Sequence, residues 1–410
     1  MHTLRICTGL AVGLMACTLL VSTPALDLDS AHAQKLAEVK KKVQKKVQKQ
    51  APPKEQQERA PFTLEDQNAA VIPGMPDARG WGDSEADFAR VLPQANGPWL
   101  AISGGGSDGA YGAGLLAGWS ESGNRPEFAM VTGVSIGSLI APFAFLGPRY
   151  DEELRKNFTT VSAADIFEDR MTSDSLFDYW PLRRTIEQRV TAKLLGEIAA
   201  EHRRGRRLLV ATTNLDAGRR VVWNMGAIAE RGDDKALKLF RDILLASCSI
   251  PGFFSGVLIE VEANGKKFQE MHGDGTLTAP FFVAPDSMFS PHATTRPPLS
   301  QLYVIVNSKI ATEFKMPDRM IAGILGRSID LALTSALRAQ IMLMNVAAQR
   351  HGISLRVAYL PASFDFPSRG PFDGKFMKAL FEFGVEQGKK GSPFADSLPD
   401  LSLRKSNPAR

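Results

Sequence analysis

The sequence predicts an α/β fold, and three observations carry that prediction. Two strand-to-turn-to-helix units follow one another between residues 99 and 146, each with glycines directly after a short apolar strand. Further strands are expected at 208–214, 220–223, 301–307 and 354–360, and helices at 234–247, 325–349 and 372–387. The chain has 410 residues and is 44% hydrophobic, which is enough to bury a full core.

Residues 1–33 have the features of a secretory signal peptide. Arg5 gives a positive start, residues 6–21 are apolar, and Ala31-His32-Ala33 forms a cleavage site before Gln34. We therefore expect export to the periplasm or cell envelope, with outer-membrane attachment or secretion as further possibilities. An uncleaved anchor and lipidation at Cys17 are the alternatives, although the apolar run is short for a bilayer and continues past that cysteine.

Residues 34–60 form a basic segment rich in Lys and Gln. Nine Lys and Arg against three Glu give it a net charge of +6, whereas the whole chain carries +5. One interpretation is a solvated linker. The other is an arm whose residues 34–50 contact a membrane surface, because basic side chains adsorb to anionic lipid. A nucleic-acid partner is not expected, because no aromatic residues are interleaved with the lysines.

The remaining chain divides into three parts. Residues 61–97 are a loop-rich lead-in with a short helical pattern at 84–92, residues 98–390 form the main domain, and residues 391–410 are a polar tail that we expect to be disordered. Once the leader is removed, Cys248 is the one remaining cysteine, so no intramolecular disulfide is expected. We interpret Cys248 as a core residue, since its neighbours include no cation.

The second strand-to-helix unit carries the spacing of a nucleophile elbow. Ser135 stands between Gly133 and Gly137, and such a tight turn requires small residues two positions before and after the serine. Ser135 is therefore the candidate nucleophile. A plain turn serine is the alternative, because this pattern also arises by chance.

The first unit carries the glycine loop of residues 103–109. The backbone N–H groups of Gly104, Gly105 and Gly106 can converge on one oxygen, as an oxyanion hole requires. A tight turn is one alternative, and a dinucleotide site is another, since Gly104-x-Gly106-x-x-Gly109 fits that pattern. No acidic residue closes a second strand about twenty positions on. The loop and the elbow in succession favour acyl transfer.

A serine nucleophile needs a base. His202, His292 and His351 lie in segments that we expect at the surface. Asp274 lies between Gly273 and Gly275 after an alternating strand pattern, where little bulk blocks its approach to another loop. We therefore favour Asp274 as the base, with an Asx turn as the alternative, and rank His272 as a residue near the site.

These motifs resemble those of the patatin-like phospholipases. The resemblance covers residues 98–390 and includes Gly104–Gly109, Gly133–Gly137, Asp274-Gly275-Thr276 and the run 246–251. It implies a three-layer α/β/α sandwich with a mostly parallel central sheet and a serine–aspartate dyad of Ser135 and Asp274. It further implies oxyanion donors at Gly105 and Gly106, with Gly104 shaping the turn, and no metal or organic cofactor.

Two positions depart from the family pattern. Asp108 stands where the family often has Arg or Lys, and Thr276 stands where it usually has Gly or Ala. The expected function is hydrolysis of acyl esters of lipids or phospholipids. A non-catalytic lipid-binding envelope protein and an esterase for soluble esters are the alternatives, and the sequence indicates no oligomeric state.

Overall fold

The computed structural model describes residues 59–395, except 173, 291, 292, 294, 312, 315 and 392. The predicted leader, nearly all of the basic segment and the last fifteen residues lie outside the described part of the chain.

Within this part, nine strands form one mixed sheet with the order β1-β5-β4-β3-β2-β8-β9 and a side hairpin β6–β7 that joins β4. The strands are β1 Arg79–Trp81, β2 Trp99–Ile102, β3 Met130–Val134, β4 Arg207–Asn214, β5 Arg219–Asn224, β6 Val257–Ala263, β7 Lys266–Asp274, β8 Gln301–Lys309 and β9 Ser354–Leu360. The central run β4-β3-β2-β8-β9 is parallel, whereas β5 and β7 pair antiparallel with β4. The sheet is therefore mostly parallel at its centre, as predicted.

Helices lie between these strands in the chain. They are α2 Leu64–Ala69, α3 Glu85–Arg90, α4 Gly109–Glu121, α5 Ile136–Leu146, α6 Asp151–Thr159, α7 Trp180–Arg189, α8 Ala192–Arg203, α9 Met225–Glu230, α10 Asp234–Ser247, α11 Ile321–His351 and α12 Gly374–Gly388. Short 3-10 turns include Gly106–Asp108 before α4 and Gly275–Leu277 after β7.

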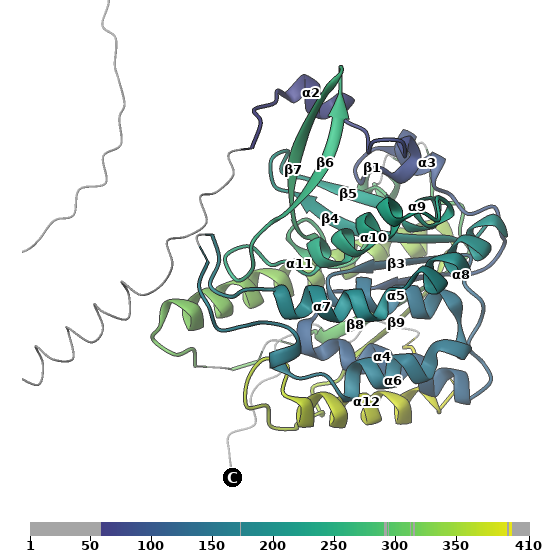
Figure 1. Ribbon diagram of the computed structural model, residues 1–410. Helices are drawn as coiled ribbons and strands as arrows, with labels where there is room; N and C mark the ends of the chain where they lie inside the picture. The colour runs from purple at the N-terminus through teal and green to yellow at the C-terminus, as the bar shows by residue number, and fades with distance from the viewer. Residues whose placement is uncertain are drawn as a thin grey trace, which may run out of the picture. The chain divides into compact units, whose positions relative to one another are not determined.

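Alternating side chains of β2 fill two separate cores. Leu100 and Ile102 belong to the core shared with α4, α5, α10 and α12, whereas Trp99 and Ala101 belong to the core shared with α11. Because alternate residues of a strand point to opposite faces, these clusters mark the two faces of the sheet. Helices cover both faces, which confirms the three-layer α/β/α architecture (Figure 1).

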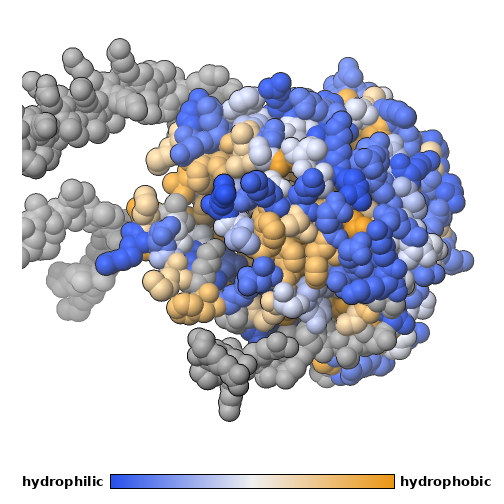
Figure 2. All heavy atoms as spheres, turned by 90° about the horizontal axis from the view of Figure 1, so that it is seen from below, coloured by the Kyte–Doolittle hydropathy of each residue, from blue (hydrophilic) through white to orange (hydrophobic). Residues whose placement is uncertain are grey.

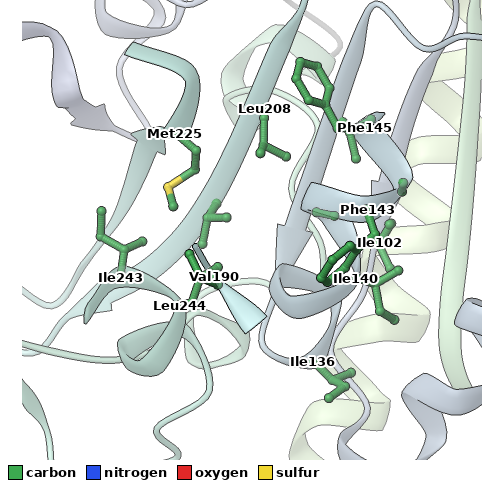
Figure 3. Close-up of a cluster of buried hydrophobic side chains, with 14 of the residues drawn as sticks. Ile102, Ile136, Ile140, Phe143, Phe145, Val190, Leu208, Met225, Ile243 and Leu244 are labelled. Carbon is green, nitrogen blue, oxygen red and sulfur yellow. The ribbon is translucent and has the colours of Figure 1, made fainter. Parts of the chain in front are cut away.

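The larger core lies directly under α5 and fixes the helix that begins one residue after Ser135. Figure 3 shows side chains from α5, α9 and α10 that meet those of β2 and β4. They include Ile102, Leu208, Ile140, Phe143, Met225, Ile243 and Leu244.

Two strands were not predicted. β1 has three residues and includes Gly80, so it carries almost no pattern. β6 alternates buried and exposed residues and turns into β7 at Asn264 and Gly265, whose φ angles of 52° and 76° suit a tight hairpin turn. That Asn-Gly pair was the available signal for the hairpin.

The tail and two histidines differ from expectation. Phe394 is buried against Trp119 and Tyr303, with ring centroids 4.7 and 4.9 Å away, so the start of the expected disordered tail is packed. His202 and His351 are half-buried rather than on the surface, and His292 lies outside the described residues. Burial, together with Arg207 and Arg203, lowers the pKa of His202 to about 4.

Candidate active site

Ser135 occupies the sharp turn between β3 and α5. Its φ of 53° and ψ of −128° are unusual for a residue with a side chain, and such backbone strain is typical of functional turns. The flanking Gly133 and Gly137 admit no side chain, because an added Cβ at either would lie 2.4 Å from a carbonyl oxygen. The Ser135 N–H donates to Ser247 Oγ at 2.9 Å, which ties the turn to the end of α10.

Asp274 ends β7 and meets Ser135. The Ser135 hydroxyl donates to Asp274 Oδ2 at 2.7 Å, although the two residues are 139 positions apart in sequence. Pairing of β7 with β4 sets Asp274 opposite Thr212, and the Asp274 N–H donates to the Ser249 carbonyl at 2.8 Å. The structure therefore brings the two candidate residues within hydrogen-bonding distance.

The carboxyl group of Asp274 is fully buried and held by two further hydrogen bonds. Its Oδ1 accepts from the N–H of Thr276 at 2.9 Å and from the Thr276 hydroxyl at 2.7 Å. Burial raises the pKa of Asp274 to about 6, against the lowering effect of the hydrogen bonds from Ser135 and Thr276. A carboxylate with such a pKa accepts a proton more readily than an ordinary aspartate and is still ionised at neutral pH.

The glycine loop lies beside this pair. An added Cβ on Gly104 would lie 2.3 Å from Thr276 Cγ2 and 3.1 Å from Ser135 Cβ, so the loop contacts both candidate residues. The Gly104 N–H donates to the Pro280 carbonyl at 3.0 Å and is thus occupied. Among the described residues, the N–H groups of Gly105 and Gly106 have no hydrogen-bond partner. They are the available donors for an oxyanion.

Asn307, near the C-terminal end of β8, holds the glycine loop in place through its side-chain amide. Its amide Nδ2 donates to the Ser103 carbonyl at 2.9 Å, and its Oδ1 accepts from the Gly112 N–H at 3.1 Å. Gly105 is pressed onto this residue with a φ of 153°, and an added Cβ would lie 1.9 Å from the Asn307 carbonyl oxygen. Only glycine fits there without moving the loop.

Replacing Gly105 with alanine is therefore expected to displace the loop and lower kcat by about 10²–10³-fold, the loss typical of removing one oxyanion donor. Gly123→Ala is the matched control, because Gly123 also has a positive φ, of 75°, but an added Cβ meets nothing within 4 Å. The measurement is kcat for a soluble nitrophenyl ester. Equal kcat values for the two variants would contradict the assignment of the loop.

Gly109 and Gly275, the glycines next to the loop and to Asp274, lie where a side chain would not fit. An added Cβ on Gly109 would lie 2.4 Å from Ile136 Cγ1, and one on Gly275 would lie 2.5 Å from the Ala211 carbonyl oxygen. Cys248 Sγ lies 3.8 Å from Ser138 Oγ, and burial, together with the charge of Asp274, raises the pKa of its thiol. The thiol therefore stays protonated.

His272 belongs to a buried polar network behind the site. Its Nε2 lies 3.2 Å from Glu270 Oε2, and its Nδ1 lies 3.0 Å from Thr212 Oγ1, which accepts the Trp223 indole N–H at 2.8 Å. Burial lowers the pKa of His272, and the hydrogen bond and charge of Glu270, which act in the opposite direction, do not outweigh it. In a neutral ring, Nε2 donates to Glu270 Oε2 and Nδ1 accepts from the Thr212 hydroxyl, so both ring nitrogens have a hydrogen-bond partner.

A cavity of about 520 Å³ lies over Ser135. Its floor is formed by Ser135, Thr276 and the glycine loop, and one wall is aromatic. The aromatic wall consists of Phe167, Phe177, Phe253, Phe254 and Phe372, and Gly326, Ile329, Leu333 and Leu337 of α11 also line the cavity. Asp108 and Asp330 also line the cavity. The cavity lining is thus largely apolar as a whole, and it includes two acidic side chains.

Sequence reasoning missed Thr276, Asn307 and Ser247 as positioning residues. Thr276 stands out in the sequence only as a departure from a family pattern, but its hydroxyl donates to the Asp274 carboxylate. No local pattern marks Asn307, and Ser247 lies in the run 246–251 without any sign of its role, because each acts on a segment more than 100 residues away. Within the described residues, no group of three or more His, Cys, Asp or Glu side chains has an arrangement that could hold a metal ion.

Comparison with known proteins gives one family match. Residues 100–285 match the model of the family described as patatin-like phospholipase. The matched range includes the glycine loop, Ser135 and Asp274. No curated protein matches the sequence significantly. Among solved structures, the crystal structure of VipD from Legionella pneumophila is similar with a TM-score of 0.31 and 12% identity, covering 77% of this chain and 70% of that chain.

Proposed function

Because this chain carries a patatin-like phospholipase domain at residues 100–285, we propose that it is a lipid acyl hydrolase with Ser135 as nucleophile and Asp274 as proton acceptor. The observation that carries the proposal is the 2.7 Å hydrogen bond from Ser135 Oγ to the buried Asp274 carboxylate, on the floor of a largely apolar cavity. An activated hydroxyl beneath apolar walls suits an ester of a fatty acid.

In the proposed reaction, Ser135 Oγ attacks the ester carbonyl carbon while Asp274 takes its proton. The N–H groups of Gly105 and Gly106 donate to the oxyanion. Collapse of this intermediate breaks the bond to the leaving alcohol, which takes the proton from Asp274. Asp274 then removes a proton from water, the resulting hydroxide attacks the acyl-enzyme, and the carboxylic acid leaves while Ser135 regains its proton.

Fluorophosphonate labelling tests the nucleophile. We expect the parent protein to gain one adduct by intact mass, with the adduct on Ser135, because only an activated hydroxyl reacts readily. Ser135→Ala is expected to remain unlabelled and to lose hydrolysis to near the uncatalysed background. Ser328→Ala is the control, since Ser328 is an exposed serine of α11.

The substrate class is tested by comparing phospholipid vesicles with a short soluble ester. Release of fatty acid from the vesicles supports the lipid assignment, whereas turnover of the soluble ester alone indicates an esterase. A folded protein that hydrolyses neither substrate and does not react with the probe would contradict catalysis and favour the alternative of a non-catalytic lipid-binding protein.

We also propose that the protein is exported through its residues 1–33 and that residues 34–50 contact a membrane surface, on the sequence features described above. The mass of the mature N-terminus tests the export. A chain that begins at Gln34 supports cleavage after Ala33, and an acylated Cys17 supports lipidation. A chain that retains residues 1–33 contradicts cleavage.

A further inference from the structure

Helix α11 is packed along only part of its length. Leu337, Ile341 and Met344 are at most 4% exposed and belong to the core on one face of the sheet. Residues Gly323–His351 are long and apolar enough to cross a membrane by length and composition, yet only 28% of the most apolar window is buried. The second half of the helix packs on the sheet, so α11 is part of the folded domain. Its remaining apolar side chains therefore lie at the surface of that domain.

The first turn of α11 and the segment before it carry an exposed apolar patch. Its members are Phe314, Met316, Met320, Ile321 and Ile324, with exposed fractions of 92%, 78%, 71%, 80% and 53%. Figure 2 shows hydrophobic side chains gathered at the edge of the molecule to which the N-terminal end of α11 extends in Figure 1. Single exposed apolar side chains are ordinary, but five within eleven residues indicate an interaction surface.

The patch adjoins the cavity over Ser135. Gly326 and Ile329, two and five residues along the helix from Ile324, line that cavity. The helix also contacts the aromatic wall, because an added Cβ on Gly326 would lie 3.6 Å from Phe253 Cζ. Whatever covers the patch therefore lies next to the cavity that contains the reacting hydroxyl.

We propose that this apolar patch docks on the surface of a phospholipid bilayer and so presents the cavity to the lipid. The proposal rests on the proposed lipid hydrolase function, since a bilayer docked on the patch supplies lipid substrate directly beside the cavity that contains Ser135. A protein seated on the patch would instead cover the approach to the cavity. Residues 313–327 hold three cations and two carboxylates, so no net negative charge repels anionic lipid.

The test measures co-flotation of the full-length protein with phosphatidylcholine vesicles. All variants carry Ser135→Ala, so that hydrolysis does not alter the vesicles and binding is read independently of catalysis. The neutral vesicles and 0.5 M NaCl suppress charge-based binding by the basic segment at residues 34–60. The triple variant Phe314→Ser, Met320→Ser, Ile321→Ser is expected to lower the fraction bound at least ten-fold.

The matched control is Leu64→Ser, Val71→Ser, Leu258→Ser. These side chains are 72%, 38% and 37% exposed and lie on or beside α2 and β6, away from the cavity. The control is expected to bind within two-fold of the parent. Equal loss in both triples would show general stickiness and overturn the proposal, as would undiminished binding of the patch variant.

Two further measurements complete the test. Thermal unfolding checks that each triple variant is folded. If the patch triple variant is not folded, Ile321→Ser alone replaces it and is expected to lower binding about two- to four-fold. Sedimentation tests a second copy as the occupant: a parent dimer that the patch substitutions convert to a monomer overturns the lipid assignment. Failure of hydrolysis with intact flotation would contradict the proposed function but leave the docking surface standing.

Discussion

Replacing Asp274 with asparagine is expected to remove most ester hydrolysis while making the folded protein more stable at neutral pH. Asparagine has nearly the same shape, and its Oδ1 can still accept from the N–H and hydroxyl of Thr276. Its amide nitrogen, however, donates to Ser135 Oγ and cannot take the serine proton. Loss of a general base lowers the rate by about 10²–10⁴-fold.

The stability gain follows from the raised pKa of Asp274. A folded-state pKa of about 6, against an ordinary value of 3.8, means that the folded protein holds this proton more tightly than the unfolded chain. The favourable contribution of the protonated group is complete below the ordinary pKa and is lost as the pH rises through about 6. At pH 8 the ionised carboxylate therefore destabilises the fold by about 3 kcal/mol relative to a neutral group.

The same pKa is expected to set the pH dependence of the proposed hydrolysis. The proposed reaction requires the ionised carboxylate, so kcat/KM is expected to fall as the pH drops below about 6. The measurement is kcat/KM between pH 4.5 and 8.5, together with urea unfolding of parent and Asp274→Asn at pH 4 and pH 8. The stabilisation should be present at pH 8 and nearly absent at pH 4. A variant that retains the parent rate would remove Asp274 from the reaction.

Those parts of the site that depend on consecutive residues were predictable from the sequence. The strand β3, Ser135 and the start of α5 follow one another, and the small residues that the turn requires appear at fixed positions around the serine. The glycine loop after β2 is likewise local. A parallel arrangement of β2 and β3 then brings both turns to one edge of the sheet.

The residues that hold these turns in place were not predictable, because they arrive from distant segments. Asn307 reaches the loop from β8, and Ser247 reaches Ser135 from the end of α10. Asn307 is a single polar residue after an apolar strand, and the run 246–251 that contains Ser247 does not reveal which segment Ser247 contacts. A helix was predicted at 325–349, whereas α11 starts four residues earlier and ends two residues later, and that it lines the cavity depends on tertiary packing alone.

The role of the lead-in, residues 61–97, also could not be predicted from the sequence, and one of its contacts has a large expected effect on the free energy of unfolding. The sequence of this segment indicated no function, yet its β1 pairs with β5 and places Arg79 against the buried carboxylate of Glu270. Burial alone would raise the pKa of Glu270, but hydrogen bonds from His272 and Arg79, with the charge of Arg79, lower it to about 2. The side chains of Arg79 and Glu270 are only 7% and 0% exposed.

Replacing Glu270 with glutamine is therefore expected to lower the free energy of unfolding by about 3–5 kcal/mol at pH 7, because it leaves the Arg79 charge buried without its counter-charge. Glu260→Gln is the control on the same hairpin, since the Glu260–Lys267 pair is 3.4 Å long and both side chains are more than half exposed. Loss of an exposed pair changes stability by less than about 1 kcal/mol. Urea unfolding with comparison of m-values measures both variants.

The pH dependence distinguishes this ion pair from a simple packing defect. The lowered pKa of Glu270 contributes stability that is fully present above its ordinary value of 4.5 and is lost as the pH falls toward about 2. The difference between parent and Glu270→Gln should therefore shrink between pH 5 and pH 3, whereas a packing defect would persist. A difference that stays constant with pH, or one below 1 kcal/mol at pH 7, would contradict the role assigned to the Arg79–Glu270 pair.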